Sequence, residues 1–98
     1  MKIDKKIENG KAYYALEGRL DTTTAPDLEN ELKGDMDSIT ELILDFSKLD
    51  YISSAGLRVL LSAHRVMSRK GAMKVTNVNE IVNEVFEVTG FSDILTIE

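Results

Sequence analysis

The feature that most constrains the fold is the segment Leu42-Ile43-Leu44-Asp45-Phe46, which is nearly continuous in apolar, strand-forming residues. Such a run is typical of a central strand that is buried on both faces of a parallel sheet. An amphipathic segment follows, from about Ser54 to Lys70, and Gly71 is expected to end it. A strand followed by a helix and a further strand needs a crossover connection. The pattern therefore predicts an α/β fold with helices packed on the sheet.

The segments before this run predict a hairpin and a helix. Residues 3–7 and 11–18 flank Asn9-Gly10, a dipeptide whose tolerance of positive φ suits a tight hairpin turn. A helix should then begin near Pro26, capped by one of the threonines at 22–24. We expect Gly34 to weaken or end this helix. Its apolar seam is formed by residues at four-residue spacing: Leu28, Leu32 and Met36.

The segments after the run complete the order β-β-α-β-α-β-α-β. Residues 73–76 alternate as a strand, Gly90 is expected to end a third amphipathic helix, and residues 94–97 form a short last strand. The apolar residues of that third helix are Ile81, Val82, Val85, Phe86 and Val88. No linker or repeat interrupts the chain, so we expect a single domain over residues 1–98 with a mixed, mostly parallel sheet.

Composition narrows the range of functions. The 98-residue chain is 43% hydrophobic and 30% charged, which is ordinary for a globular protein. Its net charge of −5 disfavours direct binding of nucleic acid, which relies on clustered Lys and Arg. Cysteine is absent, so thiolate catalysis and Cys-ligated metals are excluded. With no signal peptide pattern and no long apolar run, we expect a cytoplasmic protein that does not insert into a membrane.

The segment after the central strand carries the candidate site. It reads Tyr51-Ile52-Ser53-Ser54-Ala55-Gly56-Leu57, and the second helix begins within it. A phosphate on Ser54 would sit beside free N–H groups at the positive end of that helix. Two interpretations remain open: Ser53 or Ser54 is only an N-cap beside a packing glycine, or Ser54 is a modified residue on a binding surface. Gly56 leaves room for a partner or for a neighbouring backbone.

Two separated motifs resemble those of STAS domains, the anti-sigma factor antagonists. The first is Leu44-Asp45-Phe46-Ser47 followed, after a short spacer, by Ser53-Ser54-Ala55-Gly56-Leu57, and the second is Gly18-Arg19-Leu20-Asp21 with the residues at 22–25. The length and order of elements also agree, so the resemblance spans the chain. Two positions depart from the common pattern: Ser53, where many members have aspartate, and Arg19, where many have an acidic residue.

The resemblance implies partner switching. The unphosphorylated protein would bind an anti-sigma factor that is also a serine kinase, and phosphorylation of Ser54, with Ser53 as the alternative, would break that complex. A metal-dependent serine phosphatase would restore it. The resemblance implies no cofactor, no metal and no catalytic residue in this chain. The partner-binding surface is expected to comprise Asp21, Thr22, Ser53, Ser54, Gly56 and Arg58.

Helix geometry adds a stripe of arginines to this site. At 100° per residue, Arg58, Arg65 and Arg69 fall within about 40° of one another, with Ser54 near the same line. The stripe is either a solvated face or a dock for an acidic partner. His64, the only histidine, falls on the apolar side and is expected to pack there. Ten residues of helix separate it from Ser54, about 15 Å, which argues against a serine hydrolase.

The sequence is compatible with three functions. The first is the phosphorylation-switched antagonist. The second is a STAS accessory subunit of a transporter or stress-signalling complex that has no phosphoswitch. The third is a small enzyme or a receiver domain phosphorylated on Asp45, which is expected to end the central strand. Asp45 is otherwise expected to accept hydrogen bonds from the following loop, and the glutamates at 80, 84 and 87 to form a solvated helix face.

Overall fold

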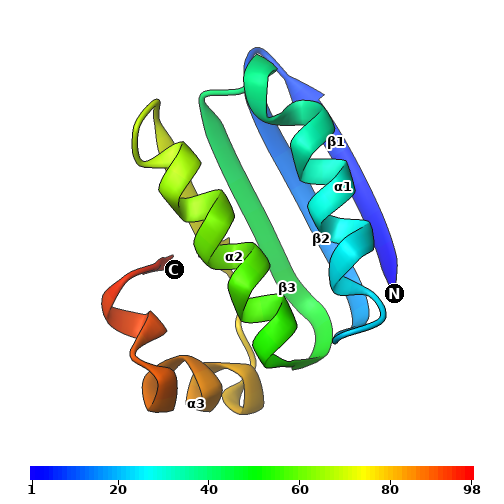
Figure 1. Cartoon of the computed structure of the whole chain (residues 1–98), viewed down its shortest axis with the longest axis vertical. Coiled ribbons are helices and arrows are strands. Elements are labelled where there is room, and N and C mark those ends of the chain that lie inside the picture. Colours follow the sequence, from blue (N-terminus) through cyan, green and yellow to red (C-terminus); the bar gives the residue numbers. More distant parts are fainter.

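The computed structural model describes residues 1–98, whose strands form one five-stranded sheet in the order β1-β2-β3-β4-β5 (Figure 1). The predicted order of elements is confirmed. In chain order the elements are β1 (Lys2–Glu8), β2 (Lys11–Leu20), α1 (Ala25–Asp35), β3 (Glu41–Ile52), α2 (Ser54–Met67), β4 (Ala72–Thr76), α3 (Glu80–Thr89) and β5 (Thr96–Ile97), with short 3₁₀ turns at Met36–Ser38 and Phe91–Asp93.

The sheet is mixed and mostly parallel, as predicted. β1 pairs antiparallel with β2 through the turn at Asn9 and Gly10, whose φ angles are 53° and 78°. The β2–β3, β3–β4 and β4–β5 pairs are all parallel. Each parallel connection contains a helix, so the carboxyl ends of β2, β3 and β4 meet at one edge of the sheet.

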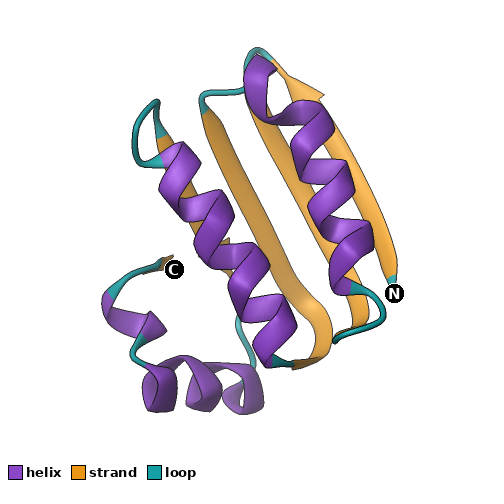
Figure 2. Ribbon diagram, viewed as in Figure 1, coloured by secondary structure: helices purple, strands orange, loops and turns teal.

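The helices leave one face of the sheet uncovered. α1 and α2 lie side by side on the same face, and α3 lies across one end of the molecule (Figures 1 and 2). In β3 the residues beneath the helices are fully buried, whereas Glu41, Ile43 and Asp45 on the other face are only half-buried. The expectation that 42–46 is buried on both faces is therefore wrong, because no helix packs on the second face.

β3 is also longer than the sequence suggests. It continues through Ser47–Ile52, which we expected to be a loop, and its pairing with β2 shifts register twice. Such irregularities bend a strand and let it carry polar residues without losing its partner. Leu49 and Ile52 remain buried, so the core follows the strand to its end. The bend brings the end of β3 to the start of α2.

Both ends of α1 differ from what the local sequence predicts. α1 continues through Gly34 to Asp35, since an exposed glycine only weakens a helix that is packed on its other side. Thr24 is the N-cap by position, but its side chain makes no capping bond. The carbonyl of Asp21 instead accepts from the amide of Ala25 over 2.8 Å. The expected threonine cap is therefore wrong.

α2 and α3 end at or near their glycines. α2 ends at Met67 and a turn leads to Gly71, where a Cβ would overlap the Thr40 carbonyl oxygen. The N-cap of α3 is Asn79, whose side chain accepts from the Val82 amide, and its C-cap is Gly90, with φ 83°, where the helix was predicted to end. Only two residues of α3 are buried, Val82 and Phe86. The remaining apolar residues expected in its core-facing set are half-buried or exposed.

Candidate functional site

The candidate site lies at the carboxyl edge of the parallel strands. β2 and β3 end in register, with Leu20 opposite Ile52. The amide of Ser53 then donates to the carbonyl of Leu20 over 2.9 Å. Asp21 and Ser53 therefore leave two adjacent strands at the same level. The structure brings the ends of the two sequence motifs together, although Asp21 and Ser53 are more than thirty positions apart in the chain.

Ser54 is the first residue of α2 and its side chain is exposed. The hydroxyl makes no hydrogen bond within the chain, and no acidic residue lies in the first turn of the helix. The first turn of a helix has free N–H groups and a positive dipole end. An added phosphate on this hydroxyl would meet favourable donors and no carboxylate of the same turn.

Ser53 occupies a different environment from its neighbour. It is the N-cap residue, with extended backbone angles, but its hydroxyl makes no bond to the helix. The Oγ atom is buried and has no hydrogen-bond partner. The hydroxyl cap expected for Ser53 is therefore absent. A buried Oγ cannot be approached by a kinase without opening the structure, so the geometry favours Ser54 over Ser53 as a phosphoacceptor.

Gly56 serves the packing of α2 and faces the chain's own core. It is buried, and a Cβ at this position would lie 2.7 Å from Leu20 Cγ and 2.9 Å from Ile52 Cγ1. Both distances are shorter than real side chains allow. The glycine lets the first turn of α2 rest on the ends of β2 and β3. Of the two roles expected for Gly56, the close approach within the chain is the one that these contacts explain.

Asp21 organises the loop between β2 and α1. Its Oδ1 accepts from the Thr23 hydroxyl at 2.8 Å and amide at 3.0 Å, and also from Thr24. The Thr23 hydroxyl, followed by these amides, holds the pKa of Asp21 below its usual value, against the opposing effect of burial. Thr22 is exposed beside it. Arg19 stacks over the Tyr51 ring at 4.3 Å and lies 3.7 Å from Asp21.

The arginines of α2 and of the turn that follows it are exposed and unpaired. Arg58, Arg65 and Arg69 form no ion pair, although the chain is acidic overall. Arg58 lies one turn after Ser54 on the same side of the helix. His64 is half-buried, and the regular helix keeps it about 15 Å along the axis from Ser54. The structure therefore places Ser54 beside a cation and away from the only imidazole.

Asp45 lies inside β3 rather than at its end, so the expected position is corrected. Seven residues of strand follow it. Its carboxylate accepts from the Ser47 amide at 2.9 Å and from the Asn77 side chain at 3.1 Å. The donors expected in a following loop are therefore found in β3 itself and just after β4. No group of three potential ligands among His, Asp and Glu side chains comes together to hold a metal ion. The acidic cluster that a receiver domain needs is not formed around Asp45.

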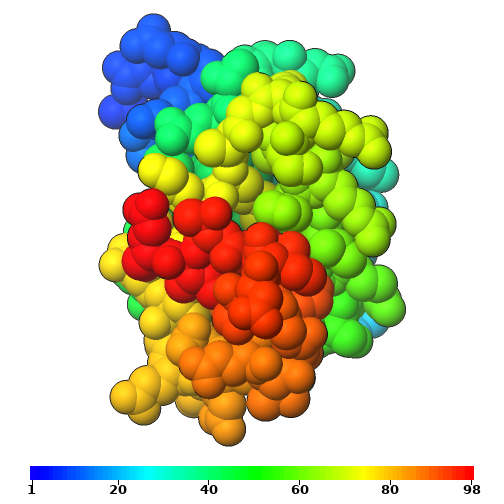
Figure 3. Space-filling view, turned by 90° about the vertical axis from the view of Figure 1, so that its left-hand side faces the viewer, coloured from blue at the N-terminus to red at the C-terminus, as the bar shows by residue number.

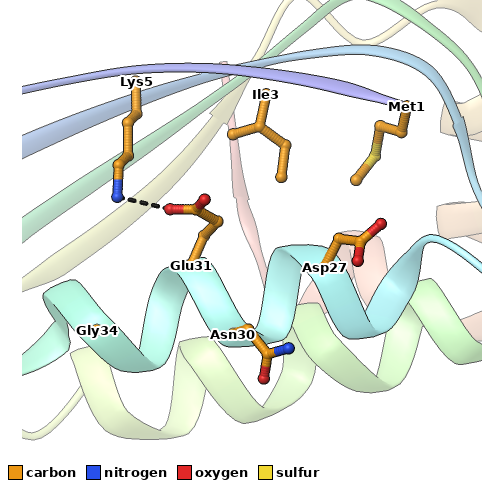
Figure 4. A pocket seen from close by; sticks show the side chains of 7 residues that line it. All are labelled: Met1, Ile3, Lys5, Asp27, Asn30, Glu31 and Gly34. Atoms are coloured by element: carbon orange, nitrogen blue, oxygen red, sulfur yellow. Dashed lines mark hydrogen bonds and ion pairs between the residues drawn. The ribbon is translucent and has the colours of Figure 1, made fainter.

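A hollow lies between β1 and α1 (Figure 4). It has a volume of about 560 Å³, and an ion pair of 2.6 Å between Lys5 and Glu31 crosses one end. Ile3 of β1 and Met1, just before that strand, point into it (Figure 4). None of the predicted site residues lines it.

None of the helices combines the length and apolar character needed to cross a membrane.

Comparison with known proteins defines the class. The family model described as the STAS domain matches residues 2–98, and the chain belongs to that family. The protein BtrV of Bordetella bronchiseptica, described as an anti-sigma factor antagonist, is 36% identical over 99 residues, covering 99% of this chain and 85% of BtrV. The anti-sigma-B factor antagonist of Bacillus subtilis is 25% identical over 96 residues, covering 97% of this chain and 88% of that protein.

Solved structures agree on the fold. The crystal structure of a Thermotoga maritima protein described as an anti-sigma factor antagonist superposes with a TM-score of 0.90 at 19% identity, covering 97% of this chain and 84% of that one. The anti-sigma factor antagonist SpoIIAA in its unphosphorylated form gives 0.80 at 16% identity, covering 99% and 87%. At these identities the structures support the fold alone.

Proposed function

We propose that the chain is an anti-sigma factor antagonist that acts by partner switching and has no catalytic activity of its own. In this proposal the cytoplasmic protein binds an anti-sigma factor when Ser54 is unmodified. The anti-sigma factor is also the kinase that phosphorylates Ser54, and a serine phosphatase removes the phosphate. The names of two relatives, at 36% and 25% identity, support the antagonist assignment.

One observation carries the choice of Ser54. Of the two adjacent serines, Ser54 is exposed with a free hydroxyl, whereas the Oγ of Ser53 is buried. Phosphorylation would add about −1.5 to −2 charges to the surface where Asp21 is already ionised. The favourable contacts at the start of α2 keep the modified chain folded, and the new charge repels a partner that fits the unmodified surface.

Arg58 is the residue that links charge at Ser54 to the partner. In the unmodified protein its guanidinium is free to pair with a carboxylate of the anti-sigma factor. A phosphate one turn earlier would compete for the same cation. Thr22 and Asp21 complete the surface from the neighbouring strand end.

The test combines phosphorylation with binding. The protein is incubated with ATP and a candidate anti-sigma factor kinase, and the phosphosite is mapped by mass spectrometry. We expect phosphate on Ser54, constitutive binding by Ser54→Ala, and binding by Ser54→Asp that is weaker by tenfold or more, about 1.4 kcal/mol. Ser53→Ala is the matched control and should be phosphorylated and bind normally. Phosphate on Ser53 alone, or equal binding by the two Ser54 variants, would refute the switch and favour an accessory subunit.

A further inference from the structure

Helix α3 exposes an apolar stripe that the core does not use. Ile81 and Val88 are 62% and 81% exposed, and Val85 lies half-buried between them. An acidic stripe runs beside it, and α3 contains no basic residue. The acidic stripe consists of Glu80, Glu84 and Glu87, all exposed and none in an ion pair. This surface therefore suits a neighbour that combines apolar and basic groups.

Helix α2 has a surface of that kind. A groove of about 300 Å³ between α1 and α2 is lined mainly by apolar side chains, including Val66, which is 42% exposed. The residues of α2 that line it are Val59, Ser62, Ala63 and Val66. Arg65 precedes the groove residue Val66 in α2, and Arg69 lies in the turn two residues after the helix; both are exposed and form no ion pair. Both α2 (yellow-green) and α3 (orange) reach the outer surface of the molecule (Figure 3).

The two helices have the same layout with opposite charge. In each, the apolar stripe lies about 100° around the axis from the charged stripe, in the same rotational sense. When two such helices pack face to face and antiparallel, like stripes meet: apolar against apolar, and arginine against glutamate. A parallel arrangement would instead place each charged stripe on the other helix's apolar stripe. The geometry therefore selects the antiparallel arrangement.

One register satisfies both stripes at once. Glu80 and Glu84 are four residues apart, as are Arg69 and Arg65, so antiparallel packing can pair Glu80 with Arg69 and Glu84 with Arg65. The same register places Val66 between Ile81 and Val85 of the other helix. It leaves Arg58 and Ser54, at the start of α2, outside the paired segment.

We infer that the α3 stripe of one chain packs antiparallel on the α1–α2 groove of a second copy. The two surfaces differ, so the contact is head-to-tail. In a dimer, one chain therefore still has a free α3 stripe and the other a free α1–α2 groove. Association therefore continues beyond a dimer into a ring or a chain. The contact is separate from the proposed Ser54 switch, because its register does not include Ser54 or Arg58.

Sedimentation equilibrium of the purified protein at concentrations up to about 1 mM tests this, a range that covers weak contacts. We expect a weight-average mass that rises past that of a dimer with concentration and falls with added salt. Arg65→Glu with Arg69→Glu, and separately Ile81→Asp with Val88→Asp, should each weaken association by about tenfold or more. Arg58→Glu is the matched control on the same helix and should leave association unchanged. Circular dichroism confirms that each variant is folded.

Mixing the two variants gives the sharper result. The α2 variant keeps an intact α3 and the α3 variant keeps an intact α2, so their mixture should form one contact and stop at a 1:1 dimer. A symmetric contact between identical surfaces would give no such heterodimer and would overturn the proposal. A protein that stays monomeric throughout the concentration range would overturn it too. Anti-sigma binding by the same α2 variant, retained if the switch proposal holds, separates a failure here from a failure of that proposal.

Discussion

The amide of Ser53 donates a hydrogen bond of 2.9 Å to the carbonyl of Leu20, which ties the start of α2 to the end of β2. Ser54 and Asp21 are each one residue beyond this bond. A backbone hydrogen bond therefore sets the spacing between Ser54 and Asp21. The Ser54 side chain itself makes no hydrogen bond within the chain.

Replacing Ser53 with alanine should not destabilise the protein. Replacing an N-cap serine with alanine normally lowers the free energy of unfolding by about 1 kcal/mol, because the serine hydroxyl caps the helix. Here the hydroxyl is buried without a partner, so its removal should leave the free energy of unfolding unchanged or raise it by up to about 1 kcal/mol. Urea denaturation measures the difference.

The matched control for Ser53→Ala is Asn79→Ala at the cap of α3. The Asn79 side chain accepts from the Val82 amide at 2.8 Å and donates to the Leu49 carbonyl at 2.7 Å. Its loss should cost about 1–2 kcal/mol. A loss of similar size at Ser53 would show that its hydroxyl is bonded in solution.

Gly56→Ala and Gly34→Ala should have opposite signs. A Cβ on Gly56 would push against Leu20 and Ile52, which should cost about 1–3 kcal/mol. Gly34 is also helical but has no atom within 4 Å of the added carbon. There alanine should stabilise the protein by about 0.5–1 kcal/mol through helix propensity. Equal effects in thermal unfolding would contradict the close packing at Gly56.

Tyr14→Phe should destabilise the protein far more than Tyr13→Phe. The Tyr14 ring is fully buried, and its hydroxyl hydrogen-bonds with the Glu31 carbonyl at 3.0 Å and with the Asp35 carboxylate. Removing the hydroxyl should cost about 1–3 kcal/mol, since one acceptor is charged. Tyr13 is 41% exposed on the uncovered face, and its change should stay within about 0.5 kcal/mol. Equal losses in urea denaturation would rule out this role for the Tyr14 hydroxyl.

Asp45 should contribute to acid sensitivity. The Ser47 amide, followed by the Asn77 side chain, outweighs burial and holds the pKa of Asp45 below its ordinary value of 3.8. A carboxyl whose folded pKa is lowered stabilises the protein above the unfolded pKa, and this stability is lost as the pH falls through the folded value. Asp45→Asn should therefore lower stability at neutral pH and flatten its decline below pH 3.8.

Denaturation at several pH values checks the Asp45 prediction. Asp50→Asn is the control, because Asp50 is exposed and its side chain makes no hydrogen bond or ion pair. Its substitution should change the free energy of unfolding at neutral pH by no more than about 0.5 kcal/mol. An identical profile for wild type and Asp45→Asn would show that the Ser47 and Asn77 bonds do not persist in solution.

Much of the fold could be predicted because its signals are local. The turn at Asn9 and Gly10, the Gly90 stop and the alternation of apolar residues each depend on neighbours in the chain. The extension of β3 could not be predicted in this way. Ser47, Lys48 and Asp50 break the apolar pattern, and only the bulged pairing with β2 keeps them in the strand.

The features of the candidate site also differ in whether local sequence predicts them. Ser54 could be singled out from its motif and its place at a helix start. The buried state of the Ser53 hydroxyl and the close contacts of Gly56 depend on how α2 meets two strand ends, which no local pattern encodes. The exposure of Ile81 and Val88 could not be predicted from local sequence either, because it depends on how little of α3 packs against the core.

The free hydroxyl of Ser54 has a consequence for the lifetime of the protein. Because it contributes no hydrogen bond to the fold, the proposed phosphorylation would break no bond within the chain. A cell could then cycle the same molecules through many rounds of signalling without exposing them to proteolysis in either state. The fraction of unmodified protein would then follow the ratio of the proposed kinase and phosphatase activities, and protein abundance would stay constant.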